Sequence, residues 1–210
     1  MMSENNTFSK LREQEKDIRR NIIIDAAEKE FISKPFNKVN MRDIAKNAGI
    51  SPASIYRYFP DQQSLFIEAF VRGTIDIFEK LSKIVKNSTD GSLEQVADDF
   101  TDYFTRNDQY FRMMMHFFLD GPVDSRVFEK LIALERKLLE EFDIIFQKLN
   151  VKEDIRLYSH AFFSALVGMV ATFRNHPSKS EEDVLRHRKR IARMFSRLII
   201  DALLYRNSKK

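Results

Sequence analysis

The sequence contains no cysteine among its 210 residues, so disulfide bonds and thiolate metal sites are excluded. Glycine and proline are scarce, with five of each, too few for the many turns of a β-sandwich or β-barrel. The longest nearly apolar stretch, residues 161–173, is shorter than the roughly 20 residues of a membrane-spanning helix. The polar residues 1–20 predict no signal peptide. These absences favour a cytoplasmic protein that has no membrane partner.

Apolar residues recur at helical spacing along most of the chain, and alternation with a period of two is hard to find. The predicted fold class is all-α with about nine helices. Two short helices are expected at Met41 to Asn47 and about Pro52 to Tyr58, followed by a long helix from Asp61 through Ile84. The other helices are expected at about Lys16 to Ser33, 93–104, 127–149, 155–173 and 184–205. Breaks are expected at 87–92, 121–122 and 176–180.

Helix caps crowd together between residues 40 and 61. Asn40, Ser51 and Asp61 each precede a helical stretch and are good N-cap residues. Gly49 suits the left-handed residue that follows a helix, and Pro52 suits a first helical position. Two short helices joined by a tight turn are therefore predicted, which form a helix-turn-helix unit. A helix about 10–12 Å across fits the B-DNA major groove, which is about 12 Å wide.

The second short helix leaves small, hydroxyl and basic side chains for the exposed face. Small residues let the backbone approach the groove, while tyrosine and arginine reach phosphates or base edges. The predicted face consists of Ser51, Ala53, Ser54, Tyr56, Arg57 and Tyr58. Packing is the alternative role for one of the two tyrosines.

The segment from Arg19 to Phe66 resembles the N-terminal domain of the TetR family of repressors. The family pattern is a helix ending in Ala-Ala and Phe, an "IA..AG.S...IY.YF" core, and a long helix containing leucine. The matching residues are Ala26, Ala27, Phe31, Ile44, Ala45, Ala48, Gly49, Ser51, Ile55, Tyr56, Tyr58, Phe59 and Leu65. The resemblance covers under a third of the chain. It implies a DNA-binding domain at residues 1–72 and an effector-binding and dimerisation domain at residues 73–210, both helical.

The resemblance also implies roles for single residues. Arg42 matches a position that often contacts a base or phosphate, and Tyr56 a frequent phosphate contact. The complete predicted DNA-binding set is Arg42, Ser51, Pro52, Ala53, Ser54, Tyr56, Arg57, Tyr58 and Gln62. Two residues depart from the family pattern: Gln62 replaces a usual lysine, and Pro35 replaces a usual glycine that proline cannot mimic at positive φ. The basic residues Lys10, Arg12, Lys16, Arg19 and Arg20 are either a minor-groove arm or a disordered tail.

Phenylalanine and methionine crowd the middle of the chain, where the resemblance implies an effector pocket. Most such residues belong to the core, but methionine-rich walls also adapt to apolar ligands. We therefore predict a small apolar or amphipathic effector. Its predicted contacts are Phe104, Phe111, Met114, Met115, Phe162 and Phe163, with Arg112, His116 or Arg174 at its polar end.

The last two long helices are the predicted dimer interface, because small residues on one helix allow close approach of apolar residues on the other. Two such helices from each subunit form a four-helix bundle, as the resemblance implies. The predicted interface residues are Ala161, Ala165, Gly168, Thr172, Phe195, Leu198, Ile199 and Ala202. A contact within one chain is the alternative.

Neither a catalytic motif nor a metal-ligand spacing is found, so no enzyme activity, metal or cofactor is expected. The net charge of +4 permits nucleic acid without requiring it. The predicted function is a homodimeric regulator that a small-molecule effector releases from a double-stranded palindromic operator, most simply a repressor. The alternatives are a constitutive DNA binder and an all-α ligand carrier that has lost DNA binding.

Overall fold

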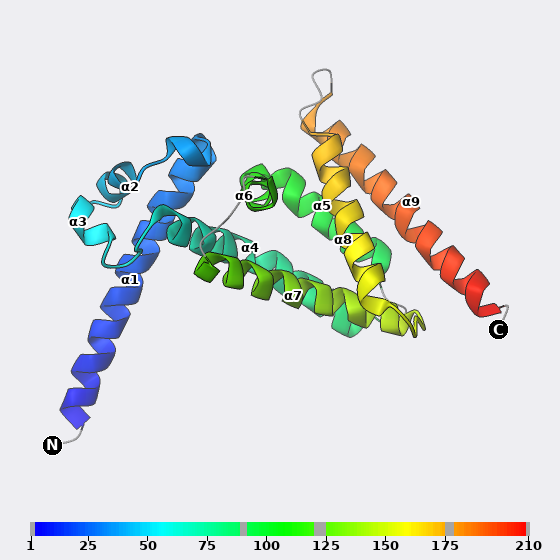
Figure 1. Ribbon diagram of the computed structural model, residues 1–210, viewed down its shortest axis with the longest axis horizontal. Coiled ribbons are helices and arrows are strands. Elements are labelled where there is room, and N and C mark those ends of the chain that lie inside the picture. The colour runs from blue at the N-terminus through cyan, green and yellow to red at the C-terminus, as the bar shows by residue number, and fades with distance from the viewer. Residues whose placement is uncertain (1–2, 89–91, 120–124, 175–178, 209–210) are drawn as a thin grey trace. The chain divides into compact units, whose positions relative to one another are not determined.

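The computed structural model describes residues 3–88, 92–119, 125–174 and 179–208, and in these ranges it is helical without strands (Figure 1). The predicted all-α class with nine α-helices is confirmed. The elements are α1 Ser3–Ser33, the 3₁₀ turn η1 Phe36–Lys38, α2 Met41–Asn47, α3 Pro52–Ile55, α4 Gln62–Asn87, α5 Leu93–Arg106, α6 Asp108–Leu119, α7 Ser125–Lys148, α8 Ile155–Thr172 and α9 Glu181–Ser208. The predicted break at 121–122 lies outside the described residues, as do parts of the breaks at 87–92 and 176–180.

Contacts divide the chain into two compact units. Unit 1 comprises Met1–Gly73 and Arg112–Lys130, and unit 2 comprises Thr74–Phe111 and Leu131–Lys210. Helices α4, α6 and α7 each contain residues of both units. The functional boundary at residue 72 stays a prediction.

Helix α1 begins at Ser3 rather than at Lys16, so the sequence-based start of this helix was wrong. Residues 7–19 are all exposed, and their three large apolar residues, Phe8, Leu11 and Ile18, are too few to indicate a helix by apolar spacing. The basic residues of this segment lie on a helix and not in an irregular tail. The second half of α1 buries Ile23, Ala27 and Phe31, which supply its part of the unit 1 core.

An aromatic cluster fills unit 1 beside the end of α1. Phe66 of α4 meets Phe31 edge to face, with ring centroids 4.6 Å apart, and lies 4.8 Å from Phe36. His116 and Phe117 of α6 complete the cluster, His116 at 4.3 Å from Phe36 and Phe117 at 5.1 Å from Phe66. Edge-to-face pairs of this kind stabilise a core beyond their buried area. They fix the start of α4 against the end of α1.

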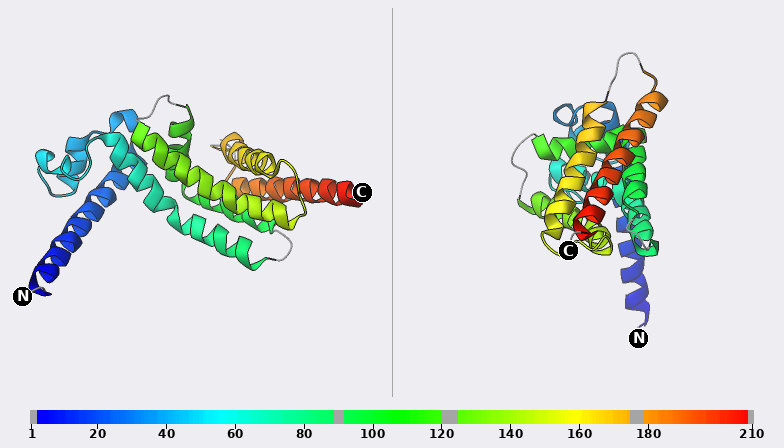
Figure 2. Two further views of the ribbon diagram at one scale, coloured as in Figure 1. Left: turned by 60° about the horizontal axis from the view of Figure 1, so that its bottom comes forward. Right: turned by 90° about the vertical axis from the view of Figure 1, so that its right-hand side faces the viewer.

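In unit 2, helices α5, α8 and α9 pack against one another (Figure 2). Helix α5 buries Phe100 and Phe104, and α8 buries Phe162 and Leu166. Helix α9 has two different faces. Its buried face carries Val184, Arg188, Ala192, Ser196 and Leu203, whereas Leu198 and Tyr205 are 58% and 62% exposed.

Helix α8 is largely apolar although only part of it is buried. It is the helix among the described residues that is long and apolar enough to cross a membrane, and 28% of it is buried inside the chain. One such helix is weak evidence of a membrane span, because a helix that packs on protein passes the same test. The exposed apolar residues of α8 would be covered if a second subunit packed on them, as the dimer prediction expects.

Candidate nucleic-acid interface

Helices α2 and α3 are held by the caps that the sequence predicts. The Asn40 side chain accepts a hydrogen bond from the Asp43 backbone N–H at 2.8 Å, and Ser51 accepts one from the Ser54 N–H at 3.2 Å. Asp61 likewise accepts from the Ser64 N–H at 2.7 Å and caps α4. Each cap satisfies a backbone donor that the first helical turn leaves unpaired.

The turn between α2 and α3 is a Schellman motif. Gly49 has φ +69°, its N–H donates to Lys46 O at 3.1 Å, and the Ile50 N–H donates to Ala45 O at 3.0 Å. Ile44, Ala45 and Ile55 are fully buried and hold the two helices together. The predicted helix-turn-helix unit is therefore present, with α3 shorter than expected and followed by turns through Tyr58.

Most of the predicted DNA-binding residues lie on the surface of the helix-turn-helix. Tyr56 is 52% exposed. Arg42, Ser51, Pro52, Ala53 and Arg57 are also exposed, and Ser54, Tyr58 and Gln62 are half-buried. The exposed set combines small residues at the start of α3 with a tyrosine and an arginine just beyond its end. This composition suits contact with a groove and its phosphates. The assignment of each contact stays a prediction.

The two departures from the family pattern have local explanations. Pro35 has φ −58° and ψ 150°, and it begins the 3₁₀ turn η1 without needing a positive φ. Gln62 donates a hydrogen bond from Nε2 to Phe36 O at 2.8 Å. The amide therefore ties the start of α4 to η1, a packing role that a sequence comparison does not reveal.

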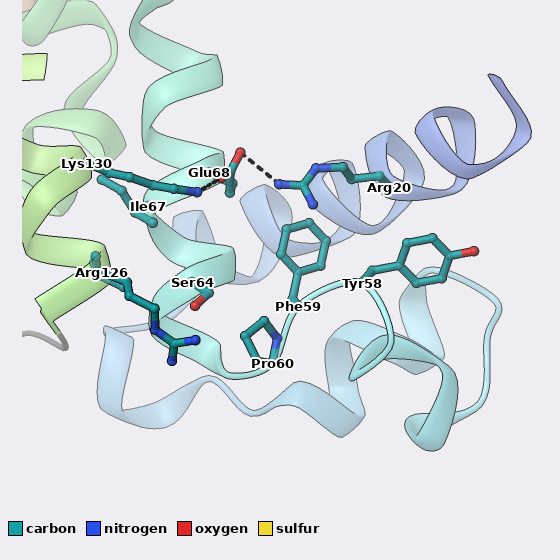
Figure 3. A pocket seen from close by; sticks show the side chains of 10 residues that line it. Arg20, Tyr58, Phe59, Pro60, Ser64, Ile67, Glu68, Arg126 and Lys130 are labelled. Atoms are coloured by element: carbon teal, nitrogen blue, oxygen red, sulfur yellow. Dashed lines mark hydrogen bonds and ion pairs between the residues drawn. The ribbon is translucent and has the colours of Figure 1, made fainter. Parts of the chain in front are cut away.

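A pocket of about 220 Å³ lies within unit 1, next to the end of the helix-turn-helix (Figure 3). Its charged centre is Glu68 of α4, which pairs with Arg20 of α1 at 3.0 Å and with Lys130 of α7. Arg20 also lies 4.6 Å from the centroid of the Phe59 ring. Burial alone would raise the pKa of Glu68, but hydrogen bonds and charges from Lys130 and Arg20 outweigh burial and lower it. Sequence spacing did not indicate this cluster, since its members come from three helices.

The predicted effector residues divide between the units. Arg112, Met114, Met115 and His116 belong to unit 1. Arg112 donates to Ile32 O at 2.9 Å, near the end of α1, and His116 packs in the aromatic cluster. Both polar candidates of unit 1 thus have structural contacts.

The remaining effector candidates belong to unit 2. Phe104, Phe111, Phe162 and Phe163 are buried there. Arg174 donates through Nε and Nη2 to the two carboxylate oxygens of Asp108, both at 2.6 Å, and lies 5.9 Å from the Phe111 ring. Phe104 and Phe111 are neighbours, with ring centroids 6.2 Å apart. The structure thus joins an arginine to two of the predicted aromatic contacts.

Sequence reasoning missed Arg188 of α9, which is 3% exposed. It donates to Thr105 Oγ1 at 2.8 Å and to Val170 O at 2.7 Å, so it joins α9 to α5 and α8. A signal was available: Arg188 lies four residues from Val184 and from Ala192, on the buried face of the helix. A cation on an apolar stripe departs from the usual solvated position of arginine.

The predicted dimer residues lie mainly on the outer faces of α8 and α9. On α8, Ala161, Gly168 and Thr172 are exposed and Ala165 is half-buried. On α9, Leu198 and Ala202 are exposed, and Phe195 and Ile199 are half-buried. A side chain added at Gly168 meets no atom within 4 Å. These faces have room for a partner, but none of these contacts is tested by a single chain.

Comparison with known proteins agrees with this geometry. Residues 23–69 match the family model described as bacterial regulatory proteins, tetR family. An uncharacterized HTH-type transcriptional regulator of Haemophilus influenzae is 28% identical over 130 residues, which cover 60% of this chain and 62% of that protein. The HTH-type transcriptional activator FasR of Mycolicibacterium smegmatis is 23% identical over 160 residues, 74% of this chain and 69% of its own. The match thus spans less than two thirds of the Haemophilus protein.

A solved structure shows the same fold over most of the chain. The transcriptional regulator FadR from Bacillus subtilis, in complex with stearoyl-CoA, superposes with a TM-score of 0.64 at 19% identity. The superposition covers 81% of this chain and 96% of that one. At this identity the similarity establishes the helical fold of both units.

Proposed function

Because its N-terminal residues 23–69 belong to the bacterial regulatory proteins of the tetR family, we propose that this chain is a homodimeric, ligand-responsive repressor. It is proposed to act in the cytoplasm. The observation that carries the proposal is the exposed face of a capped helix-turn-helix. Ile44 and Ile55 are buried behind that face, while Tyr56 and Arg57 point outward from the core. A surface of this composition suits a groove of double-stranded DNA.

The exposed apolar faces of α8 and α9 support the proposed dimerisation. Leu157, Leu198 and Tyr205 are each more than half exposed on helices that already pack on their other side. Large apolar surfaces of this kind mark association sites. A two-fold dimer would present two copies of α3 to half-sites about 34–36 Å apart, hence a palindromic operator.

Helix α6 offers a direct route from an effector to the DNA-binding domain. Its first residue, Asp108, is held by Arg174, and one turn later Arg112 donates to Ile32 O of α1. A short helix transmits displacement of one end to the other. We expect an effector that displaces Asp108 to act on Arg112 through this helix, which contains residues of both units. Helix α4, which runs from unit 1 into unit 2, is the second route.

The effector is proposed to be apolar or amphipathic, because aromatic side chains dominate the candidate contacts. The FadR complex with stearoyl-CoA is one case in which this fold binds a ligand with a long acyl chain. Repression is the simplest outcome of operator binding. FasR is described as an activator, so the fold does not determine whether a regulator represses or activates. A promoter-reporter assay decides between the two.

Fluorescence anisotropy on the DNA upstream of the protein's own gene tests DNA binding. Specific affinity that falls steeply between two salt concentrations is expected, because phosphate contacts release counterions. Arg42→Ala and Tyr56→Phe are each expected to weaken binding, by about 1–3 kcal/mol where Arg42 contacts a base. Arg136→Ala, which removes an exposed arginine of α7, is the matched control and should bind as the wild type does.

The outcomes separate the alternatives. Unchanged affinity in both variants removes Arg42 and Tyr56 from the interface. Absence of specific binding by the wild type favours the ligand carrier. Specific binding that no candidate effector alters favours the constitutive DNA binder.

A further inference from the structure

Arg188 is a buried cation without an anionic partner of its own. Its two hydrogen-bond acceptors, the Thr105 hydroxyl and the Val170 carbonyl, are neutral. Its Nε is buried and has no hydrogen-bond partner. A guanidinium is costly to bury unless its charge is paired and its donors are satisfied. The contacts within the chain satisfy only part of this requirement.

The nearest charges leave an excess of positive charge. Burial lowers the pKa of Arg188; Asp108 raises it and Arg174 lowers it further. Both carboxylate oxygens of Asp108 already accept hydrogen bonds from Arg174. The Val170 carbonyl lies in the last turn of α8, where the helix dipole supplies about half a negative charge. Arg188 therefore contacts a neutral hydroxyl and the carbonyl end of α8, while the Asp108 carboxylate is bound to Arg174.

Apolar side chains adjoin this cationic site. Arg174 lies over Phe111, and Phe111 neighbours Phe104 on α5, the helix whose Thr105 accepts from Arg188. Phe100 extends the aromatic group, at 4.7 Å from Phe104 and 6.2 Å from Phe163. An anion that is small at one end and apolar at the other matches both parts of this environment.

We infer that Arg188, assisted by Arg174, binds the carboxylate of an apolar carboxylic acid, the effector's polar end. The inference rests on the proposed ligand response and specifies its chemistry. A carboxylate accepts two parallel hydrogen bonds from a guanidinium and would supply the acceptor that Nε lacks. It would also compete with Asp108 for Arg174.

The test compares matched ligands on matched variants by isothermal titration calorimetry. The probes are straight-chain carboxylic acids and phenyl-substituted carboxylic acids, each paired with the primary alcohol of the same skeleton. The variants are Arg188→Met and, on the same helix, Arg193→Met, whose exposed guanidinium pairs with Asp98. The wild type and Arg193→Met are expected to bind an acid at least about tenfold more tightly than its alcohol. Arg188→Met should lose that preference while keeping its affinity for the alcohol.

A second measurement distinguishes ligand binding from a purely structural role. Without ligand, Arg188→Met is expected to melt at or above the wild-type temperature, because it removes an incompletely paired buried charge. Arg188→Lys keeps the charge but lacks the two-pronged donor, so it should fold and show a weaker preference for acids.

Three results would overturn the inference. They are equal affinity for acid and alcohol in the wild type, undiminished preference for acids in Arg188→Met, and binding of none of the acids. In each case operator binding by the wild type, measured separately, would leave the proposed DNA-binding function intact. Absence of operator binding by the wild type would instead refute the proposed DNA-binding function.

Discussion

Glu68 shows how one side chain joins three helices of unit 1. Its carboxylate accepts from Arg20 of α1 and Lys130 of α7 while it belongs to α4. Because the cluster is only partly open to solvent, its ion pairs are stronger than ordinary surface pairs, although weaker than fully buried ones. These ion pairs thereby hold α4 against α1 and α7 beside the pocket that Phe59 also lines.

Glu68→Gln is expected to reduce the free energy of unfolding by about 1–2 kcal/mol at pH 7. The pKa of Glu68 is lowered in the folded protein, so its contribution is complete above the ordinary value of 4.5 and is lost as pH falls through the folded value. Urea denaturation of both proteins between pH 7 and pH 3 measures the difference, which should shrink on acidification. A difference that is constant with pH would contradict the assigned charge interaction.

At the scale of elements, the turn between α2 and α3 depends on one glycine. A Cβ at Gly49 would meet nothing within 4 Å, so a substitution there causes no clash and its cost comes from the left-handed backbone alone. Gly49→Ala is expected to cost about 1 kcal/mol of stability, and Gly49→Asn less, since asparagine tolerates this conformation better. Urea denaturation midpoints test the order. Equal stability of all three proteins would show that the turn relaxes without the motif.

Local elements were the most predictable part of this fold. The caps at Asn40, Ser51 and Asp61 and the turn at Gly49 depend on neighbouring residues, so short sequence patterns suffice to identify them. The first half of α1 escaped prediction because its few large apolar residues, Phe8, Leu11 and Ile18, form no continuous apolar stripe among the polar ones.

Pairings between distant elements could not be predicted in the same way. Arg188 and Thr105 are far apart in the sequence, as are Gln62 and Phe36. The sequence prediction for α9 named residues such as Leu198 and Ala202, which lie outside, but did not identify Ala192 and Ser196, which face the core. A helix with apolar residues on two sides does not reveal which side faces its own chain.

At the scale of the whole molecule, the dimer can be tested at Gly168. This residue is exposed on α8, and an added side chain finds open space within one subunit. Gly168→Glu should therefore leave the subunit folded but place a charge where two apolar faces meet. A shift from dimer to monomer at micromolar concentration is expected in sedimentation velocity, with at least about a tenfold loss of operator affinity.

The matched control for this variant is Gln147→Glu, which adds the same charge at an exposed position of α7. It should remain dimeric and bind the operator normally. A wild type that sediments as a monomer, or a Gly168→Glu protein that stays dimeric, would place the interface elsewhere.

The two-faced character of α9 has a thermodynamic consequence. Arg188 on its inner side and Leu198 on its outer side lie on one continuous helix, so a displacement of the helix moves both residues. In the proposed dimer, a ligand that shifts this helix from within would alter the affinity of one subunit for the other. Reciprocity then requires that association of the subunits alters the affinity for ligand by the same factor. The ligand dissociation constant of this protein would accordingly be a function of its own concentration.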